Sequence, residues 1–207
     1  MQVIGISGKI GTGKTTLANH LVDKLGEGWR RLAYGDVMKR EVSDKFHVPI
    51  KDCYEKKERL WPVGMYYRPD KGEGVALRAP YMSIRRLLQW WGTDVRRGQD
   101  PDYWVSQMRE ALRRAKINAI QGVVVDDVRF ENEAQLIKDL RGRLIRLNPY
   151  GEWVCDPKVA EHESETALDD YTGWDLNVYP GYGELEKLAR GVIRLQEVYE
   201  RTIVLRP

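Results

Sequence analysis

The sequence begins with a stretch whose residue types could hold a chain of phosphates: GKIGTGKTT, at residues 8–16. It satisfies the pattern GxxxxGK[ST], in which glycines let backbone N–H groups turn inward around a polyphosphate. The helix expected to follow would add its positive N-terminal end. Lys14 could reach the β- and γ-phosphates of a nucleotide, and the Thr15 hydroxyl could hold Mg²⁺. The candidate residues for binding a nucleoside triphosphate are therefore Gly8, Gly11, Thr12, Gly13, Lys14, Thr15 and Thr16.

The flanking residues place this motif between a strand and a helix. Residues 3–7 predict a short buried strand that runs directly into the glycine-rich loop. Residues 15–25 predict a helix, because the leucines at 17, 21 and 25 share one stripe and Gly26 stands just past the end. A strand, a glycine-rich loop and a helix in this order are what a phosphate-binding loop requires.

Asp36 follows the strand expected at residues 31–34 and begins the helix expected at residues 36–45. A carboxylate there could orient an acceptor molecule or a Mg²⁺-bound water, and it could equally be the N-cap of the helix. Lys39 lies one helical turn further on. It could steady phosphate charge or be an ordinary solvated lysine.

The stretch SIRRLLQWWGTD, residues 83–94, predicts a helix with Ser83 as its N-cap and Gly92 just past its end. Arg85 and Gln89 are four residues apart and share a face, where a guanidinium beside an amide could grip a phosphate and a base edge. A solvated polar face is the alternative. The predicted core stripe contains Ile84, Leu87, Leu88 and Trp91, and both Trp90 and Trp91 are assigned to the core rather than to base stacking.

The stretch GVVVDDVRFENE, residues 122–133, contains the clearest buried strand, predicted over residues 122–128 because its valines are β-branched. An acid at the end of a strand beside the phosphate-binding loop could order the shell of a Mg²⁺ ion, which makes Asp127 a candidate. Arg129 could reach the same crevice. Glu133, one turn beyond Arg129, could buttress it or form a surface salt bridge.

A loop further on contains His162, Ser164 and Glu165 within EHESETALDDY. A Ser/His/acid cluster invites a hydrolase interpretation, which we reject because no GxSxG elbow is present and Ser164 does not follow a clear strand. The arginines just before this loop, at residues 141, 143 and 146, could instead lie near the nucleotide, with the loop as a flexible cover.

The order of the predicted elements indicates an α/β fold. Further helices are expected over residues 101–116, 131–140 and 183–201, and further strands over 143–147 and 176–178. Alternating strands and helices predict a parallel sheet of about five strands, covered by helices on both faces, with ligands at the carboxyl ends of the strands. Residues 46–82 contain four prolines and predict an irregular insertion, either a mobile lobe or a solvated loop.

The composition narrows the class of protein. Of the 207 residues, 42% are hydrophobic and 31% are charged, which fits one α/β domain with a real core. The net charge of +3 suits an anionic ligand and is too balanced for a nucleic-acid coat. The only two cysteines are far apart, which argues against a disulfide framework or a structural metal site. The absence of a long apolar run and of a signal-peptide pattern predicts a cytoplasmic protein without a membrane partner.

Four stretches, in the order GKIGTGKTT, SIRRLLQWWGTDVRRGQDPDYWV, VVVDDVRFENEA and HESETAL, resemble the phage-type deoxynucleoside monophosphate kinases, which are P-loop kinases of the nucleoside monophosphate kinase superfamily. The resemblance covers most of the chain and is weakest over residues 44–80. It implies a three-layer P-loop kinase fold in one domain, with a core at about 1–45 and 83–207, a substrate-binding insertion at 46–82 and a lid-like loop at 148–172. DLNVYPGYGEL at residues 175–185 departs from the Asn-Asp-Gly turn that often follows the family's last strand, so no adenine contact is carried over there.

The resemblance implies Mg²⁺-dependent transfer of the γ-phosphoryl group of ATP to a dNMP for DNA precursor synthesis, in the host cytoplasm if the chain is phage-encoded. Together with the motifs, it gives as catalytic residues Lys14, Arg129, Asp36 and Asp127. The candidate metal ligands are Thr15 and Asp127, the latter directly or through water. The candidate substrate-binding residues are Asp36, Lys39, Arg85, Gln89, Asp94, Arg97 and Arg129. The partners are then small molecules, with no nucleic acid, and a homodimer is compatible with the family.

Two other functions stay open at this point. A P-loop kinase for another small phosphorylated acceptor, of the dephospho-coenzyme A or phosphomevalonate type, would share the loop and Asp36. A P-loop ATPase acting on nucleic acid or on a protein partner would hydrolyse ATP when stimulated and would make no phosphorylated small product. The balanced charge argues against the second alternative. An assay with a panel of acceptors would distinguish the first alternative from a deoxynucleoside monophosphate kinase.

Overall fold

The computed structural model of the chain describes residues 1–67, 80–149, 151, 160–161, 163–179, 181 and 184–204, and it describes side chains as far as Val198. The chain divides into two compact units. The first contains Met1–Ala33 and Ala111–Pro207, and the second contains Tyr34–Glu110. The insertion expected at residues 46–82 lies inside the second unit, which extends beyond it on both sides.

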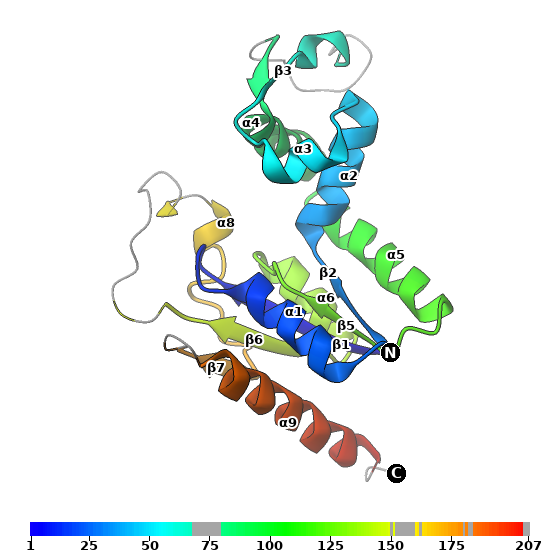
Figure 1. Cartoon of the computed structure of the whole chain (residues 1–207), viewed down its shortest axis with the longest axis vertical. Helices are drawn as coiled ribbons and strands as arrows, with labels where there is room; N and C mark the ends of the chain where they lie inside the picture. Colours follow the sequence, from blue (N-terminus) through cyan, green and yellow to red (C-terminus); the bar gives the residue numbers. More distant parts are fainter. Residues whose placement is uncertain are drawn as a thin grey trace. The chain divides into compact units, whose positions relative to one another are not determined.

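The first unit is built on a five-stranded sheet with all strands parallel, in the order β2-β5-β1-β6-β7 (Figure 1). This confirms the predicted α/β class and the predicted parallel sheet. The valine-rich β5 is shorter than expected and lies beside β1, with Gln2 paired to Gly122 and Gly5 to Val125. The strands are β1 (Gln2–Gly8), β2 (Trp29–Leu32), β5 (Gly122–Val125), β6 (Arg143–Leu147) and β7 (Leu176–Val178).

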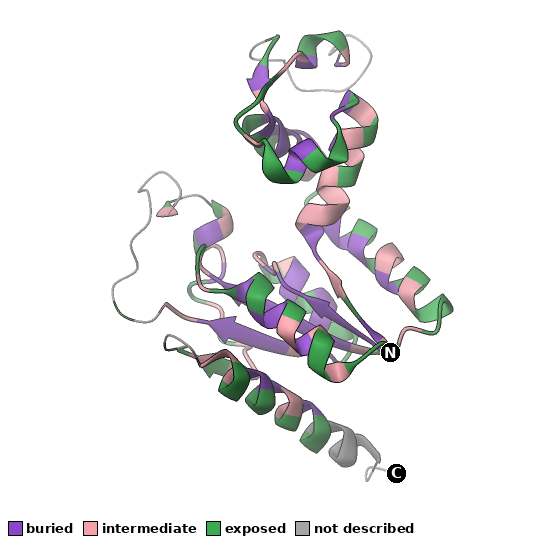
Figure 2. Cartoon of the chain, in the orientation of Figure 1, coloured by how far each residue is buried: buried purple, intermediate pink, exposed green. Residues whose placement is uncertain are grey.

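Successive residues of β1 point to opposite faces of the sheet, and both faces are covered by helices. Ile4 and Ile6 are fully buried in a core shared with α1 (Lys14–Leu25) and α9 (Leu185–Val204). On the other face, a Cβ on Gly5 would lie 3.0 Å from Ile137 of α6 (Glu131–Asp139), so the glycine lets that helix approach closely. Figure 2 shows the buried residues gathered in the strands and along the inward faces of the helices.

The second unit is mainly helical and has an aromatic core. Phe46 and Tyr67 both make edge-to-face contacts with Trp90 and Trp91, at ring-centroid distances between 4.8 and 6.4 Å. Such contacts add to the burial of large apolar surfaces. The expectation that the two tryptophans belong to the core is confirmed. The elements are α2 (Tyr34–Phe46), α3 (Ile50–Glu55), β3 (Leu60–Trp61), η1 (Val63–Met65), β4 (Met82–Ser83), α4 (Ile84–Gln89) and η3 (Trp90–Arg97), with β3 and β4 antiparallel.

Two boundaries predicted for this unit are wrong. The strand expected at residues 31–34 ends at Leu32, and Tyr34 begins α2, so Asp36 lies in the first turn of the helix rather than at its N-cap. Gly92 does not end a helix, because α4 continues directly into the π-helical segment η3. A Cβ on Gly92 would lie 2.4 Å from Sδ of Met38, so this glycine permits close packing against α2. The predicted N-cap of α4 is confirmed, since the hydroxyl of Ser83 accepts the backbone N–H of Arg86.

The helix α5 (Tyr103–Ile117) begins slightly later than expected, and the division between the two units falls within it. The Asp100 carboxylate accepts the backbone N–H of Asp102 at 2.9 Å, and the Asp100 carbonyl accepts that of Tyr103. Asp100 therefore closes a turn that precedes the helix instead of capping the helix itself.

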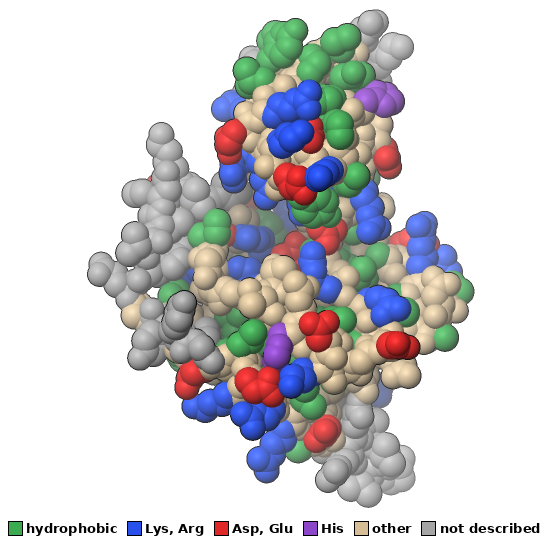
Figure 3. All heavy atoms as spheres, viewed as in Figure 1, with side chains coloured by type: hydrophobic (Ala, Val, Ile, Leu, Met, Phe, Trp, Pro, Cys, Tyr) green, Lys and Arg blue, Asp and Glu red, His purple; other side chains and the backbone are tan. Residues whose placement is uncertain are grey.

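In the part of the chain that the structure describes, no helix combines the length and the apolar character needed to cross a membrane. On the face shown in Figure 3, basic and acidic side chains are interspersed, as the balanced composition predicts.

Candidate active site

The glycine-rich loop connects β1 to α1, as the sequence predicts. Gly8, Gly11 and Gly13 have φ angles of 150°, 81° and 83°, which residues with side chains rarely adopt. A Cβ on Gly8 would also lie 2.4 Å from the carbonyl oxygen of Leu147 in β6. At Gly11 and Gly13 a Cβ would meet nothing within 4 Å, so the loop is open on that side.

Several backbone N–H groups of this loop and of the first turn of α1 are available to a ligand. Those without a hydrogen-bond acceptor among the described residues are Gly11, Gly13, Lys14, Thr15 and Thr16. No acidic residue stands in the first turn of α1, so the positive end of the helix is not offset there. Unbonded N–H groups at a helix N-terminus form an anion-binding site.

Lys14 places its charge beneath this loop. The side chain is buried, and its Nζ donates to the carbonyls of Gly8 at 2.8 Å and Lys9 at 2.7 Å. The pKa of Lys14 is lowered to about 8, mainly by burial and also by the charge of Arg129, while the charge of Glu165 offsets part of this effect. Lys14 therefore lies in an electrostatic environment in which an additional anion would stabilise its charged form.

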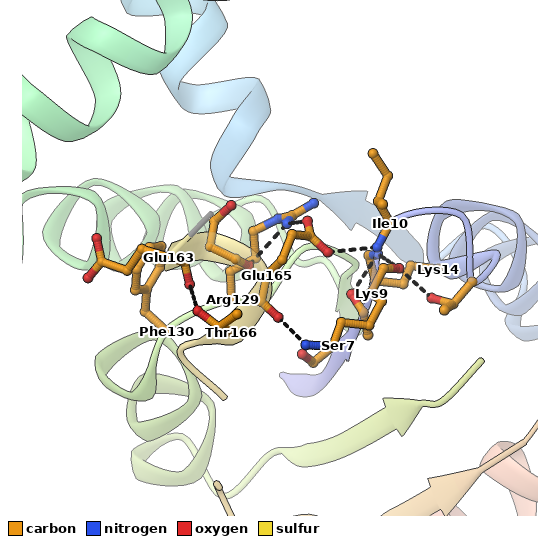
Figure 4. A network of polar contacts seen from close by, with 12 residues as sticks. Ser7, Lys9, Ile10, Lys14, Arg129, Phe130, Glu163, Glu165 and Thr166 are labelled. Carbon is orange, nitrogen blue, oxygen red and sulfur yellow. Dashed lines mark hydrogen bonds and ion pairs between the residues drawn. The ribbon is translucent and has the colours of Figure 1, made fainter. Parts of the chain in front are cut away.

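The carboxylate of Glu165 binds both the loop and Arg129 (Figure 4). Glu165 belongs to α8 (Glu163–Thr166) and is buried. Its Oε2 accepts the backbone N–H of Ile10 at 2.7 Å, and its Oε1 accepts from the guanidinium of Arg129. The carboxylate thus occupies donors of the kind that a phosphate oxygen would use.

Arg129 reaches the loop region, as expected, although its partners differ from the expected ones. Its Nη1 also donates to the carbonyl of Ser164 at 3.1 Å. The buried Glu133 accepts the backbone N–H groups of Arg129 at 2.8 Å and Phe130 at 3.3 Å. Glu133 therefore holds the backbone at the start of α6, whereas Glu165 contacts the guanidinium.

A second set of ion pairs ties the loop to the same segment. Lys9 donates to both carboxylate oxygens of Asp169 at 2.6 Å. Arg146, which is buried, donates to Oδ1 of Asp169 at 3.0 Å and to the hydroxyl of Ser7 at 3.3 Å. Of the arginines before the loop, Arg146 thus reaches the end of β1, whereas Arg143 pairs with Asp175 at 2.8 Å.

The two acids after β5 have different environments. Asp126 is buried and accepts from Arg31 at 3.0 Å, while Asp127 is half-buried. The charges of both act on the pKa of Lys14, which places them near the loop. Nowhere in the described residues do three His, Cys, Asp or Glu side chains gather to hold a metal ion. The Thr15 hydroxyl and a single carboxylate fit the way Mg²⁺ usually binds, with substrate phosphates supplying other ligands.

The remaining candidates lie in the second unit, and three of its residues form one contact group. Oδ1 of Asp36 accepts from the hydroxyl of Tyr54 at 2.7 Å and from Nζ of Lys39 at 3.1 Å. Nζ of Lys39 lies 4.0 Å from the centroid of the Tyr54 ring. Tyr54 was not among the residues that the motifs marked.

The candidates on α4 and η3 are not all brought together. Arg85 is exposed and donates through Nε to Glu58 at 2.6 Å. Gln89 and Asp94 are exposed and make no hydrogen bond with the other candidates among the described residues, and Arg97 is partly buried. His162 lies outside the described residues.

Sequence reasoning marked Glu165 and the arginine at 146 without assigning their contacts, and it missed Asp169. The signal available for Asp169 was its place in an acidic stretch just after HESETAL. That stretch does not specify which of its acids faces the P-loop, because the contacts of Asp169 with Lys9 and Arg146 join residues far apart in the chain.

Comparisons with known sequences find one family. A family model of deoxynucleotide monophosphate kinase matches residues 66–178. The chain is 30% identical over 185 residues to a protein of Acanthamoeba polyphaga mimivirus that is provisionally named deoxynucleotide monophosphate kinase. The match covers 85% of this chain and 86% of that protein.

Similar solved structures are more distant. A dephospho-CoA kinase from Campylobacter jejuni is 12% identical, with 98% of this chain and 100% of that chain covered and a TM-score of 0.49. A shikimate kinase from Bacteroides thetaiotaomicron is 15% identical, with coverages of 96% and 98% and a TM-score of 0.41. Both TM-scores are below 0.5, so the fold assignment rests on the sheet of the chain itself and on the family match.

A parallel sheet, a glycine-rich loop between its β1 and α1, and a buried lysine at the start of α1 define a P-loop nucleotide-binding protein. The family model covers more than half of the chain, and the mimivirus relative aligns along most of it. The chain belongs to the deoxynucleotide monophosphate kinase family.

Proposed function

We propose that this kinase transfers the γ-phosphoryl group of ATP to the phosphate of a dNMP, giving dNDP and ADP for DNA precursor synthesis. The observation that carries the proposal is the P-loop itself, with its unbonded N–H groups above the buried Lys14, in a chain of this family. The donor site lies in the first unit, and the expected acceptor residues lie in the second, except Arg129, which lies in the first.

On the donor side, the loop N–H groups bind phosphate oxygens and Lys14 neutralises charge on the transferred group. Lys14 is held by two loop carbonyls, so its ammonium is already oriented before the nucleotide arrives. Mg²⁺ held by Thr15 and Asp127 would supply further neutralisation of the phosphate oxygens. The positions of these side chains after β1 and β5 fit that role.

Arg129 neutralises phosphate charge once its contact with Glu165 is exchanged for a contact with phosphate. The Glu165 carboxylate and a phosphate are both anionic acceptors, so the exchange replaces one charge-assisted hydrogen bond of Arg129 by another. The N–H of Ile10 is released from Glu165 by the same movement, because one carboxylate binds both. Nucleotide binding is therefore coupled to release of the Glu165 carboxylate from the loop and from Arg129.

The acceptor needs no general base. A nucleoside monophosphate has its second pKa near ~6, so it is mostly a dianion at neutral pH and is already nucleophilic. The protein must position it in line with the donor and neutralise charge. The candidate acceptor residues are Asp36, Lys39, Arg85, Gln89, Asp94, Arg97 and Arg129. The lid-like function expected for residues 148–172 concerns a segment that lies partly outside the described residues.

The experiment is an ADP-release assay with Mg-ATP and a panel of the four dNMPs and their ribonucleotide counterparts, with products separated by chromatography. We expect a dNDP to form together with ADP. ADP release without any diphosphate product, or no turnover with every acceptor, would contradict the proposal. The next acceptors to test are then dephospho-coenzyme A and phosphomevalonate, followed by stimulation of ATP hydrolysis by nucleic acid.

A further inference from the structure

Three basic side chains of the second unit come from elements that contact one another. Lys39 lies in α2, Lys57 follows α3, and Arg85 lies in α4. The backbone N–H of Arg85 donates to the carbonyl of Lys57 at 2.7 Å, which fixes these two residues side by side. Lys39 is joined to α3 by its contact with the Tyr54 ring. We call Lys39, Lys57 and Arg85 the basic cluster.

The members of the basic cluster differ in their partners. Lys39 pairs with Asp36 at 3.1 Å, and Arg85 pairs with Glu58 at 2.6 Å. For the ammonium of Lys57, which is half-buried, the described residues provide neither a carboxylate nor a hydrogen-bond acceptor. An ammonium that is partly removed from water without a partner is costly, and an added anion would relieve that cost.

The electrostatics of Lys57 agree with its contacts. Burial lowers its pKa below the ordinary lysine value, and the positive charges of Lys39 and Arg85 lower it further. This agrees with the backbone contact between Lys57 and Arg85 and with the contact of Lys39 with α3. Three neighbouring cations, with acids bound to only two of them, leave a net positive charge in this part of the second unit.

The chemistry of this site selects its ligand. A phosphate dianion brings two charges and three oxygen acceptors, which suits several converging N–H donors from lysine and arginine. A single carboxylate brings one charge and fewer acceptors. The fold of the second unit thus gathers donors that match a phosphate monoester, and none of the sequence motifs marks Lys57.

We propose that Lys57, with Lys39 and Arg85, binds the phosphate group of the acceptor nucleotide. The proposal rests on the kinase reaction proposed above and names the group that holds its acceptor. Lys57 binds the phosphate directly, and the exposed Arg85 exchanges Glu58 for the same phosphate.

The first test is steady-state kinetics of Lys57→Gln. We expect the KM for the dNMP to rise about tenfold or more, because a charge-assisted hydrogen bond to phosphate is lost, while the KM for ATP stays unchanged. Lys57→Arg keeps the charge and should recover part of the loss. The matched control is Lys51→Gln, which removes an exposed lysine of the same unit that pairs with Glu55 at 3.6 Å.

The second test uses the wild-type protein and does not depend on turnover. An amine-selective acylating reagent at about pH 8 should modify Lys57 faster than Lys51, since the neutral amine is the reactive form. Inorganic phosphate or the dNMP should then slow the modification of Lys57 and leave Lys51 unaffected, as read by mass spectrometry of the peptides.

The outcomes separate this proposal from the proposed reaction. If dNDP forms but Lys57→Gln keeps the wild-type KM and no phosphate compound protects Lys57, the site is wrong and the reaction stands. If no acceptor is phosphorylated but inorganic phosphate protects Lys57, the anion site stands and the reaction is wrong. Should Lys57→Gln fail to fold, as judged by circular dichroism, protection of the wild-type lysine decides.

Discussion

The two groups of basic residues in this protein differ in how their charge is balanced. At the P-loop, Lys9 contacts Asp169 and Arg129 contacts Glu165, so these two cations already have anionic partners from the same unit. In the second unit, the described residues offer Lys57 no such partner.

The difference bears on how each site would bind phosphate. A compensated site must exchange partners, so the proposed nucleotide binding at the P-loop would require the Glu165 carboxylate to leave Ile10 and Arg129. Lys57 can bind an anion without first breaking an ion pair, whereas Lys39 and Arg85 of the same cluster are paired with Asp36 and Glu58. The contrast with the P-loop pairs therefore concerns Lys57 and not the whole basic cluster.

The largest expected effect is the loss of the P-loop cation. Lys14→Ala should lower kcat by about 10³-fold, because the charge that neutralises the transferred group is removed from a buried site. The ADP-release assay measures this, and circular dichroism checks that the fold is retained. Lys187→Ala, which removes an exposed lysine paired with Glu184, is the control. Full activity of Lys14→Ala would contradict the proposed mechanism.

Glu165→Gln tests whether the buried carboxylate competes with phosphate at the P-loop. Removing one negative charge beside Ile10 and Arg129 should increase the affinity for ATP about tenfold, which corresponds to about 1.4 kcal/mol of relieved repulsion. Calorimetric titration without acceptor measures the affinity. Glu163→Gln changes an exposed acid of the same helix and should have little effect. Equal affinities in the two variants would show that the P-loop end is not held by an exchangeable anion.

The pH dependence of ATP binding should follow Lys14. Its pKa is lowered to about 8 in the folded protein, so the ammonium that attracts phosphate is present below that pH and is lost above it. We expect the affinity for ATP to fall about fourfold between pH 7 and 8.5, as a single proton is lost. Titrations across this range measure the effect, and Lys14→Met should abolish it. An affinity that stays constant up to pH 9.5 would contradict the assignment.

The smallest effect is expected for Glu58→Gln. Glu58 also neutralises an arginine, but its side chain is 76% exposed and that of Arg85 is 55% exposed, so solvent screens the pair. The KM for the dNMP should change by less than about twofold. A change as large as that of Glu165→Gln on ATP binding would show that burial does not distinguish the two carboxylates.

Local patterns in the sequence predicted much of the fold. The short apolar run of β1 and the valines of β5 indicated buried strands, and Ser83 marked the start of α4. Gly92 misled because a glycine near a helix end has two explanations, termination and close packing, and only the position of Met38 distinguishes them. The roles assigned to the site residues stay predictions, since no ligand contact tests them.

The sequence by itself determined the phosphate-binding loop, because positive φ angles at Gly11 and Gly13 and the placement of Lys14 depend on near neighbours in the chain. Only the tertiary structure decided that Glu165 binds Ile10 and Arg129, and that Lys57 has no anionic partner among the described residues. Charge balance depends on which residues distant in sequence come together. The spacing of residues along the chain does not determine which distant residues come into contact.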